Sequence, residues 1–268
     1  MCGRYVTTTD ADGLVKFFVL DDRDPAARTA NVRWQGGANY NVAPTDPVPA
    51  VVRHDGQLVI TELRWGLVPF WADDRRIGAR MINARAETVA DKPAFAKSFA
   101  ERRCLIPADG FYEWEKVAGK RLPWLVRRTD GDPMVFAGIW SSWRPPATDT
   151  EADRDTRVLT CSIITTTANG VLQPIHDRMP AVLGRAVWDA WLDPQSDLGD
   201  LRQLLGPAPD SDVDRRRVST RVNSIANNDP SLLEEVSADD PTPQGEVVGP
   251  DHPSVQTTTD DGQQALFD

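Results

Sequence analysis

Short runs in which apolar and polar residues alternate recur along the chain and predict β-strands. Several runs are rich in β-branched and aromatic residues, as in VLTCSIITTTA and MVFAGIWSSW. The predicted strands cover residues 4–9, 48–53, 57–65, 103–108, 110–117, 121–128, 134–143, 158–168 and 216–222. Turn signals separate neighbouring strands: His54-Asp55-Gly56 predicts one hairpin, and Asp109-Gly110, Ala118-Gly119 and Asp130-Gly131 are predicted turns between the strands that follow.

Apolar residues at helical spacing are confined to a few short segments. Residues 9–20 begin with a Thr-Asp cap and continue with an apolar stripe, which predicts a helix. Further helices are predicted at 92–103, 186–192 and 200–206. Many short strands with few helices favour one α+β domain built mainly from antiparallel strands.

The apolar pattern ends near residue 236, where Pro, Gly, Asp, Thr and Gln become dominant. Such a composition buries too little apolar surface to fold. We expect a folded domain over residues 1–233 and a disordered acidic tail over 234–268. The end of the chain accounts for the whole net charge of −10, because ten acidic and no basic residues follow position 228. The residues before it are balanced, with 30 of each sign.

Within the balanced part, residues 75–103 carry a local excess of Arg and Lys. Trp65, Phe70 and Trp71 precede this stretch, and aromatic rings beside basic side chains suit single-stranded nucleic acid. A solvated helix face and core tryptophans explain the same residues without any ligand. We expect Trp65 to be in the core and Trp71 to be exposed.

The cysteines Cys2, Cys104 and Cys161 are odd in number and widely spaced, so they indicate neither a disulfide framework nor a zinc site. This usage favours a reducing cytoplasm. No stretch approaches the roughly 18 apolar residues of a membrane span, and the N-terminus lacks a signal pattern. We therefore expect a cytoplasmic protein with no membrane partner, no metal and no cofactor.

Cys2 directly follows the initiator methionine. If Met1 is removed, Cys2 carries a free α-amine beside its thiol, which gives two nucleophiles on adjacent carbons. An internal cysteine has no such property.

Other polar residues are candidates for acid–base or binding roles. His176 in QPIHDRMP is a candidate proton carrier because histidine titrates near neutral pH. Alternation places Asn83, Arg85 and Glu87 on one face of an extended segment. Glu113 in GFYEWE lies among packed aromatics, where desolvation raises a carboxyl pKa. Each residue also fits an ordinary structural role: a hydrogen-bonded loop histidine, a surface Arg–Glu pair and an exposed strand glutamate.

Together these segments form a recognisable set. MCGRY, YNVAPT at 40–45, RWGLVPFW, INARAET, RCLIPADGFYEW and IHDRMP at 175–180 occur in the order of one family. The sequence resembles the SOS response-associated peptidase (SRAP) family, the abasic-site processing proteins, over about residues 1–233. The resemblance implies a barrel-like core and covalent attachment to abasic sites in single-stranded DNA, as part of a DNA-damage response.

The resemblance also implies roles for individual residues. Cys2 matches the nucleophile, and Asn83, Glu113 and His176 match the other catalytic positions. The positions that match DNA-contacting residues are Arg4, Pro44, Trp71, Arg85, Lys92 and Thr165. In the implied reaction the Cys2 amine forms a Schiff base with the lesion aldehyde and the thiol closes a thiazolidine. The family name adds a peptidase event, the removal of Met1, and lyase activity is a further outcome that the resemblance leaves open.

Two other functions fit parts of the sequence. An N-terminal-nucleophile amidohydrolase also begins Met-Cys-Gly, although its glutamine-binding and oxyanion motifs are not found here. A non-catalytic binder of modified bases would not need a terminal cysteine. Separately, GQQALFD places Gln263, Leu266 and Phe267 at the end of the tail, where they resemble peptides that dock on replication sliding clamps. An accidental match in a disordered tail explains this segment equally well.

Overall fold

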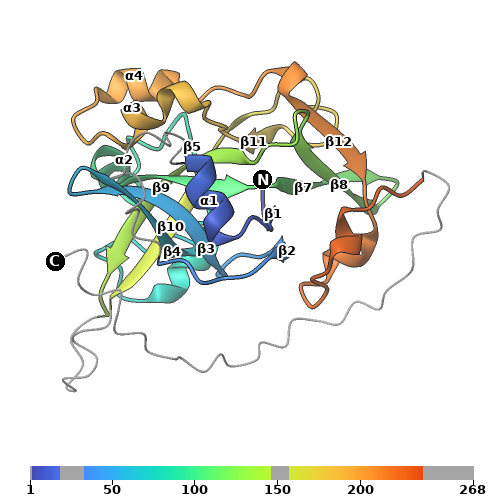
Figure 1. The fold of residues 1–268 in the computed structure, drawn as a ribbon, viewed down its shortest axis with the longest axis horizontal. Helices are drawn as coiled ribbons and strands as arrows, with labels where there is room; N and C mark the ends of the chain where they lie inside the picture. The colour runs from blue at the N-terminus through green and yellow to red at the C-terminus, as the bar shows by residue number, and fades with distance from the viewer. Residues whose placement is uncertain (1, 19–32, 146–156, 238–268) are drawn as a thin grey trace.

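The structure of the protein is a computed structural model, and it describes residues 2–18, 33–145 and 157–237 (Figure 1). The described residues form two sheets with short helices around them. The Gln263–Phe267 segment lies outside the described residues, and the division at residues 233/234 stays a prediction.

Five strands form a closed barrel, because β10 pairs with β4 on one side and with β9 on the other. Around the barrel the order is β10-β4-β3-β6-β9 and back to β10. The strands are β3 (Pro47–His54), β4 (Gln57–Trp65), β6 (Arg103–Ala108), β9 (Met134–Trp143) and β10 (Val158–Thr167). Every pairing in the ring is antiparallel except that of β10 with β4. The predicted barrel-like, mainly antiparallel core is therefore confirmed.

Two very short strands extend the barrel along β10. They are β5 (Asn83–Arg85), which runs parallel to β10, and β11 (Arg178–Pro180), which runs antiparallel to it. β5 carries Asn83 and Arg85 of the predicted site, and His176 lies two residues before β11, so β10 is the element that brings these residues together.

The second sheet has the order β12-β8-β7-β1-β2. Its strands are β1 (Arg4–Thr7), β2 (Asn39–Val42), β7 (Gly110–Val117), β8 (Lys120–Arg128) and β12 (Val213–Arg217). Tyr5 and Phe111 from this sheet both pack edge-on against Phe136 of the barrel, with ring centroids 6.1 and 6.0 Å apart. These contacts join the two sheets through one apolar core.

Alternation along the barrel strands sorts side chains into two groups. Inward residues such as Val52, Cys104 and Cys161 fill the barrel. Outward residues such as Val51 and Leu105 are covered by helices. The helices are α1 (Ala11–Phe18), α2 (Ala96–Glu101), α3 (Trp188–Leu192) and α4 (Leu198–Gln203), and Figure 1 shows α3 and α4 together at one edge, away from β8 and β12.

Two of the four predicted turns are tight hairpins. Asp55 and Gly56 have φ of 47° and 78°, and Ala118 and Gly119 have φ of 47° and 79°, as a type I′ turn requires. The turns predicted at Asp109-Gly110 and Asp130-Gly131 do not close hairpins, because at each point the chain crosses from one sheet to the other. The local turn signal is the same in both cases, and only strand pairing distinguishes them.

Two element boundaries also differ from the sequence pattern. The last strand spans Val213–Arg217 instead of 216–222, and residues Thr220–Asn223 form a 3₁₀ turn. Ser219 caps that turn by accepting a hydrogen bond from the Arg221 backbone, which competes with strand pairing. Helix α2 covers only the middle of the predicted 92–103 segment, Ala96–Glu101, and Arg103 already begins β6.

Candidate active site

Cys2 lies two residues before the start of β1, the strand between β2 and β7. Its side chain is fully buried in the core that joins the two sheets, and its Sγ donates to the Arg4 carbonyl at 3.8 Å. Burial, together with the nearby Glu113 carboxylate, raises the pKa of the Cys2 thiol well above its usual range. The thiol is therefore neutral at physiological pH.

Asn83 holds the backbone of Cys2. Its backbone pairs with Ile163 of β10, and its Nδ2 donates to the Cys2 carbonyl at 2.7 Å. The Oδ1 of the same amide is buried and accepts no hydrogen bond from the described residues. The site therefore contains an acceptor next to Cys2 that a hydroxyl or amine could satisfy.

Glu113 lies on β7 with 3% of its surface exposed, on the same strand face as Phe111. Burial raises the pKa of its carboxyl, and the positive charge of His176 partly opposes the shift. The desolvation predicted from the aromatic neighbours is present. Glu113 interacts electrostatically with both Cys2 and His176, so the three residues belong to one site.

His176 belongs to the loop before β11. Its Nδ1 lies 3.0 Å from the Arg178 backbone nitrogen and 2.9 Å from the Asp177 carboxylate. These contacts require different protonation states: a bare Nδ1 accepts from the Arg178 N–H, and a protonated Nδ1 donates to Asp177. The ring thus has a partner at Nδ1 in either state, which suits a group that gains and loses a proton.

Arg178 ties the two motifs of the site together, and the sequence reasoning missed it. It makes a two-pronged ion pair with Glu87, at 2.6 and 2.9 Å, and donates to the Thr165 carbonyl at 2.6 Å. Its side chain is only 12% exposed. Glu87 follows β5 and Arg178 begins β11, so this clamp fixes the Asn83 and His176 segments on opposite edges of β10. The sequence signal that could have indicated Arg178 is its position within the IHDRMP motif.

A second missed residue is Asn41, in YNVAPT. Its amide oxygen accepts from Arg4 at 2.6 Å, and its nitrogen donates to the carbonyls of Ser224 and Asn227 at 3.0 and 2.9 Å. Arg4 itself donates to the Val222 carbonyl at 3.0 Å. Arg4, predicted to contact DNA, therefore also anchors the 222–227 loop beside the site.

The other predicted DNA-contacting residues lie at different depths. Trp71 is half exposed, and Arg85 and Lys92 are exposed. Pro44 is partly buried in the turn before β3. Thr165 is 1% exposed, and its hydroxyl donates to the Ala84 carbonyl at 3.4 Å. Trp65 is fully buried and donates from its ring nitrogen to Ile82, so it is a core residue as expected.

Fold and site together define a closed-barrel protein whose candidate reactive residues surround an N-terminal cysteine. The chain belongs to the family described as SOS response associated peptidase (SRAP), whose model matches residues 1–225. Among the described residues no His, Cys, Asp or Glu cluster could hold a metal ion. None of the described helices is long and apolar enough to cross a bilayer.

Named relatives cover most of the chain. It is 36% identical over 236 residues to the abasic site processing protein YoqW of Bacillus subtilis, covering 87% of this chain and 99% of that protein. It is 27% identical over 270 residues to the abasic site processing protein HMCES of Xenopus tropicalis, covering 87% and 78%. A crystal structure of a Bacteroides thetaiotaomicron protein has the same fold, with a TM-score of 0.74 and 23% identity over 88% of this chain and all of that one.

Proposed function

We propose that the protein, once Met1 is removed, bonds covalently through Cys2 to abasic sites in single-stranded DNA and so shields the lesion. Two observations support this proposal. The relatives that match nearly the whole chain are named abasic site processing proteins. In the structure, the Asn83 amide holds the Cys2 backbone at 2.7 Å beside a buried carboxyl and a histidine, and this contact carries the proposal.

The chemistry begins at the amine, since burial keeps the thiol protonated. The neutral α-amine of Cys2 adds to the open-chain aldehyde, and loss of one water gives an imine. The thiol sulfur then bonds to the imine carbon, and its proton passes to the nitrogen. The product is a five-membered thiazolidine, with water as the only other product.

Glu113 suits the proton transfers of this sequence. Its raised pKa keeps a share of the carboxyl protonated nearer neutral pH, so it can protonate the departing hydroxyl and afterwards accept the thiol proton. We assign to His176 the transfer of the proton that opens the sugar ring. The bare Asn83 Oδ1 is an acceptor for the Cys2 amine or a sugar hydroxyl.

The decisive experiment compares four proteins on one abasic single-stranded oligonucleotide. Native protein lacking Met1 is expected to give a heat-stable adduct with the thiazolidine mass. Cys2→Ala and a protein with an uncleavable N-terminal tag are expected to give none, because an amide nitrogen cannot form an imine. Cys2→Ser is expected to give at most a labile adduct. Equal adduct from tagged and native protein would place the nucleophile elsewhere, with Cys104 and Cys161 next to be tested.

The same samples separate the alternatives. An amidohydrolase would release ammonia from glutamine and leave the oligonucleotide unshifted. A non-catalytic binder would shift it only under native conditions and would tolerate the tag.

A further inference from the structure

One face of the second sheet continues from the Cys2 site to the edge strand β12. Figure 1 shows β7, β8 and β12 side by side, in the order in which they pair. Glu113 of β7 is directly opposite Trp124 of β8, and Trp124 is directly opposite Arg217 of β12. Arg215 lies two residues from Arg217 on the same strand and therefore on the same face. Because Glu113 also interacts with Cys2, these neighbours are continuous with the candidate active site.

This face changes from buried to partly exposed beside Glu113. Phe111, Val126 and Val213 lie at one end of the face, in the core that joins the two sheets. Trp124 is the next residue on this face of β8, and Arg215 is the next on this face of β12. Both side chains are partly exposed. The core therefore leaves Trp124 and Arg215 accessible to solvent while it buries the acid–base residue beside them.

Arg215 is held by an aromatic ring. Its guanidinium lies over the Trp124 ring, 5.1 Å from the centroid, in a cation–π contact. The ring is itself fixed, because its Nε1 donates to the Glu115 carboxylate at 3.0 Å. Two contacts in series thus orient the guanidinium of Arg215.

The donors of this guanidinium are not used within the protein. Across the parts of the chain that the structure describes, no hydrogen bond or ion pair engages the Arg215 side chain, and its Nη1 is buried without an acceptor. Nε and Nη2 are not enclosed in this way, and these two nitrogens form one side of the planar fork. An oriented guanidinium with a free fork suits bidentate binding of a phosphate.

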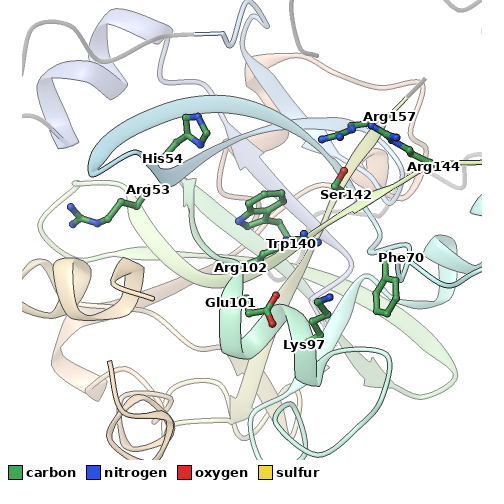
Figure 2. Close-up of a pocket in the computed structure, with 10 residues that line it drawn as sticks. All are labelled: Arg53, His54, Phe70, Lys97, Glu101, Arg102, Trp140, Ser142, Arg144 and Arg157. Atoms are coloured by element: carbon green, nitrogen blue, oxygen red, sulfur yellow. The ribbon is translucent and has the colours of Figure 1, made fainter. Parts of the chain in front are cut away.

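The Trp124–Arg215 pair is separate from the largest hollow described in the structure. Figure 2 shows that pocket, which has a volume of about 560 Å³ and surrounds Trp140. None of its lining residues belongs to β7, β8 or β12. The two features can therefore be altered independently.

We propose that Arg215, stacked on Trp124, binds a phosphate of the single-stranded DNA beside the abasic sugar. The inference rests on the proposed function for the identity of the strand. From the spacing of strands and residues in a sheet, the Cα atoms of Arg215 and Glu113 are roughly 12 Å apart. The bound phosphate is therefore one of the first on one side of the lesion.

The first test measures affinity for a single-stranded oligonucleotide that carries a tetrahydrofuran abasic analogue, which has no aldehyde and cannot be crosslinked. Arg215→Gln removes the charge, whereas Arg215→Lys keeps the charge and loses the planar fork. Arg216→Gln is the matched control. It makes the same charge change at the next residue of β12, which faces the opposite side of the sheet.

We expect Arg215→Gln to bind more weakly and to lower the slope of log affinity against log salt by about 0.7, the value for one phosphate contact. Arg215→Lys is expected to bind more weakly with the wild-type slope, and Arg216→Gln to match wild type in both quantities. Wild-type affinity in both Arg215 variants would overturn the proposal, as would an equal loss in Arg216→Gln. Thermal melting checks that each variant is folded, and Arg215→Lys alone decides if Arg215→Gln does not fold.

A second test locates the phosphate. Single phosphates on either side of the analogue are replaced, one at a time, by neutral methylphosphonates. At one position near the lesion the replacement is expected to weaken binding by wild type and to cause no further loss in Arg215→Gln, because both changes remove the same contact. Additive losses at every position would show that Arg215 contacts none of these phosphates.

Crosslinking of a genuine abasic oligonucleotide by wild-type protein separates this inference from the proposed function. If no adduct forms, the covalent function fails, while binding of the analogue still decides the role of Arg215. If the adduct forms and both Arg215 variants bind the analogue as wild type does, only the present inference fails.

Discussion

At the scale of single residues, the site combines two groups whose neutral forms are favoured by burial. The Cys2 thiol and the Glu113 carboxyl both have pKa values raised mainly by desolvation. A neutral thiol is a poor nucleophile, which fits a reaction that the amine begins. A carboxyl in an apolar site is a better proton donor near neutral pH but costs folding free energy when it ionises.

Glu113→Gln is expected to stabilise the fold at neutral pH and to slow crosslinking. Between the ordinary value of 4.5 and the raised folded pKa, the native state binds more protons than the unfolded state, so wild-type stability falls as pH rises through that window. Glutamine removes this dependence. Melting temperatures of both proteins from about pH 4 to about pH 8 should therefore diverge as pH rises. Parallel curves would contradict the assignment.

The same variant has a kinetic consequence. Loss of a general acid–base group is expected to reduce the crosslinking rate by roughly 10²–10⁴-fold while leaving the adduct mass unchanged. An unaltered rate would remove Glu113 from the mechanism.

At the scale of elements, β10 organises the site through two three-residue strands. β5 and β11 are too short to be stable alone, and each is held by its pairing with β10. The Arg178–Glu87 ion pair joins them across β10, and the guanidinium also bonds the Thr165 carbonyl of that strand. The clamp sets the positions of Asn83 and His176 relative to each other.

Arg178→Lys is expected to slow crosslinking without changing single-stranded DNA affinity. Lysine keeps the charge but loses the planar fork that reaches Glu87 twice and Thr165 once. The expected stability loss is about 1–3 kcal/mol, measured by urea unfolding. Arg221→Lys, at the more exposed pair with Asp229, is the control and is expected to change neither quantity. If Glu87→Gln adds its full effect to Arg178→Lys, the two residues do not act as a unit.

At the scale of the whole molecule, the excess of acidic residues is confined to the end of the chain. An acidic terminal segment follows a balanced body, and the exposed basic residues Arg85 and Lys92 follow the exposed rings of Phe70 and Trp71 in the chain. A protein with a pI near 4.8 can therefore still present a cationic surface to a polyanion.

Arg85→Ala is expected to weaken binding of single-stranded DNA and to reduce the salt slope by about 0.7, the value for one phosphate contact. Fluorescence anisotropy at several salt concentrations measures both quantities. Lys120→Ala, in the exposed β7–β8 hairpin, is the matched control. An unchanged slope for Arg85→Ala would show that this guanidinium faces away from the strand.

Local patterns in the sequence determined the strand content, the Asp55-Gly56 and Ala118-Gly119 hairpins, the core role of Trp65 and the desolvation of Glu113. Each depends on residues close in the chain: alternation, a left-handed turn or aromatic neighbours on one strand. The motifs also indicated Cys2, Asn83, Glu113 and His176 as a group, from their chemistry and from resemblance.

Only the tertiary structure decided which strands pair. The same Asp-Gly signal makes a hairpin at residue 55 and a crossover at residue 109, because pairing depends on contacts distant in sequence. The barrel closure, the Arg178–Glu87 clamp and the Arg4–Asn41 anchor all depend on such contacts. No local pattern encodes them, since each exists only where separate segments meet on the folded barrel.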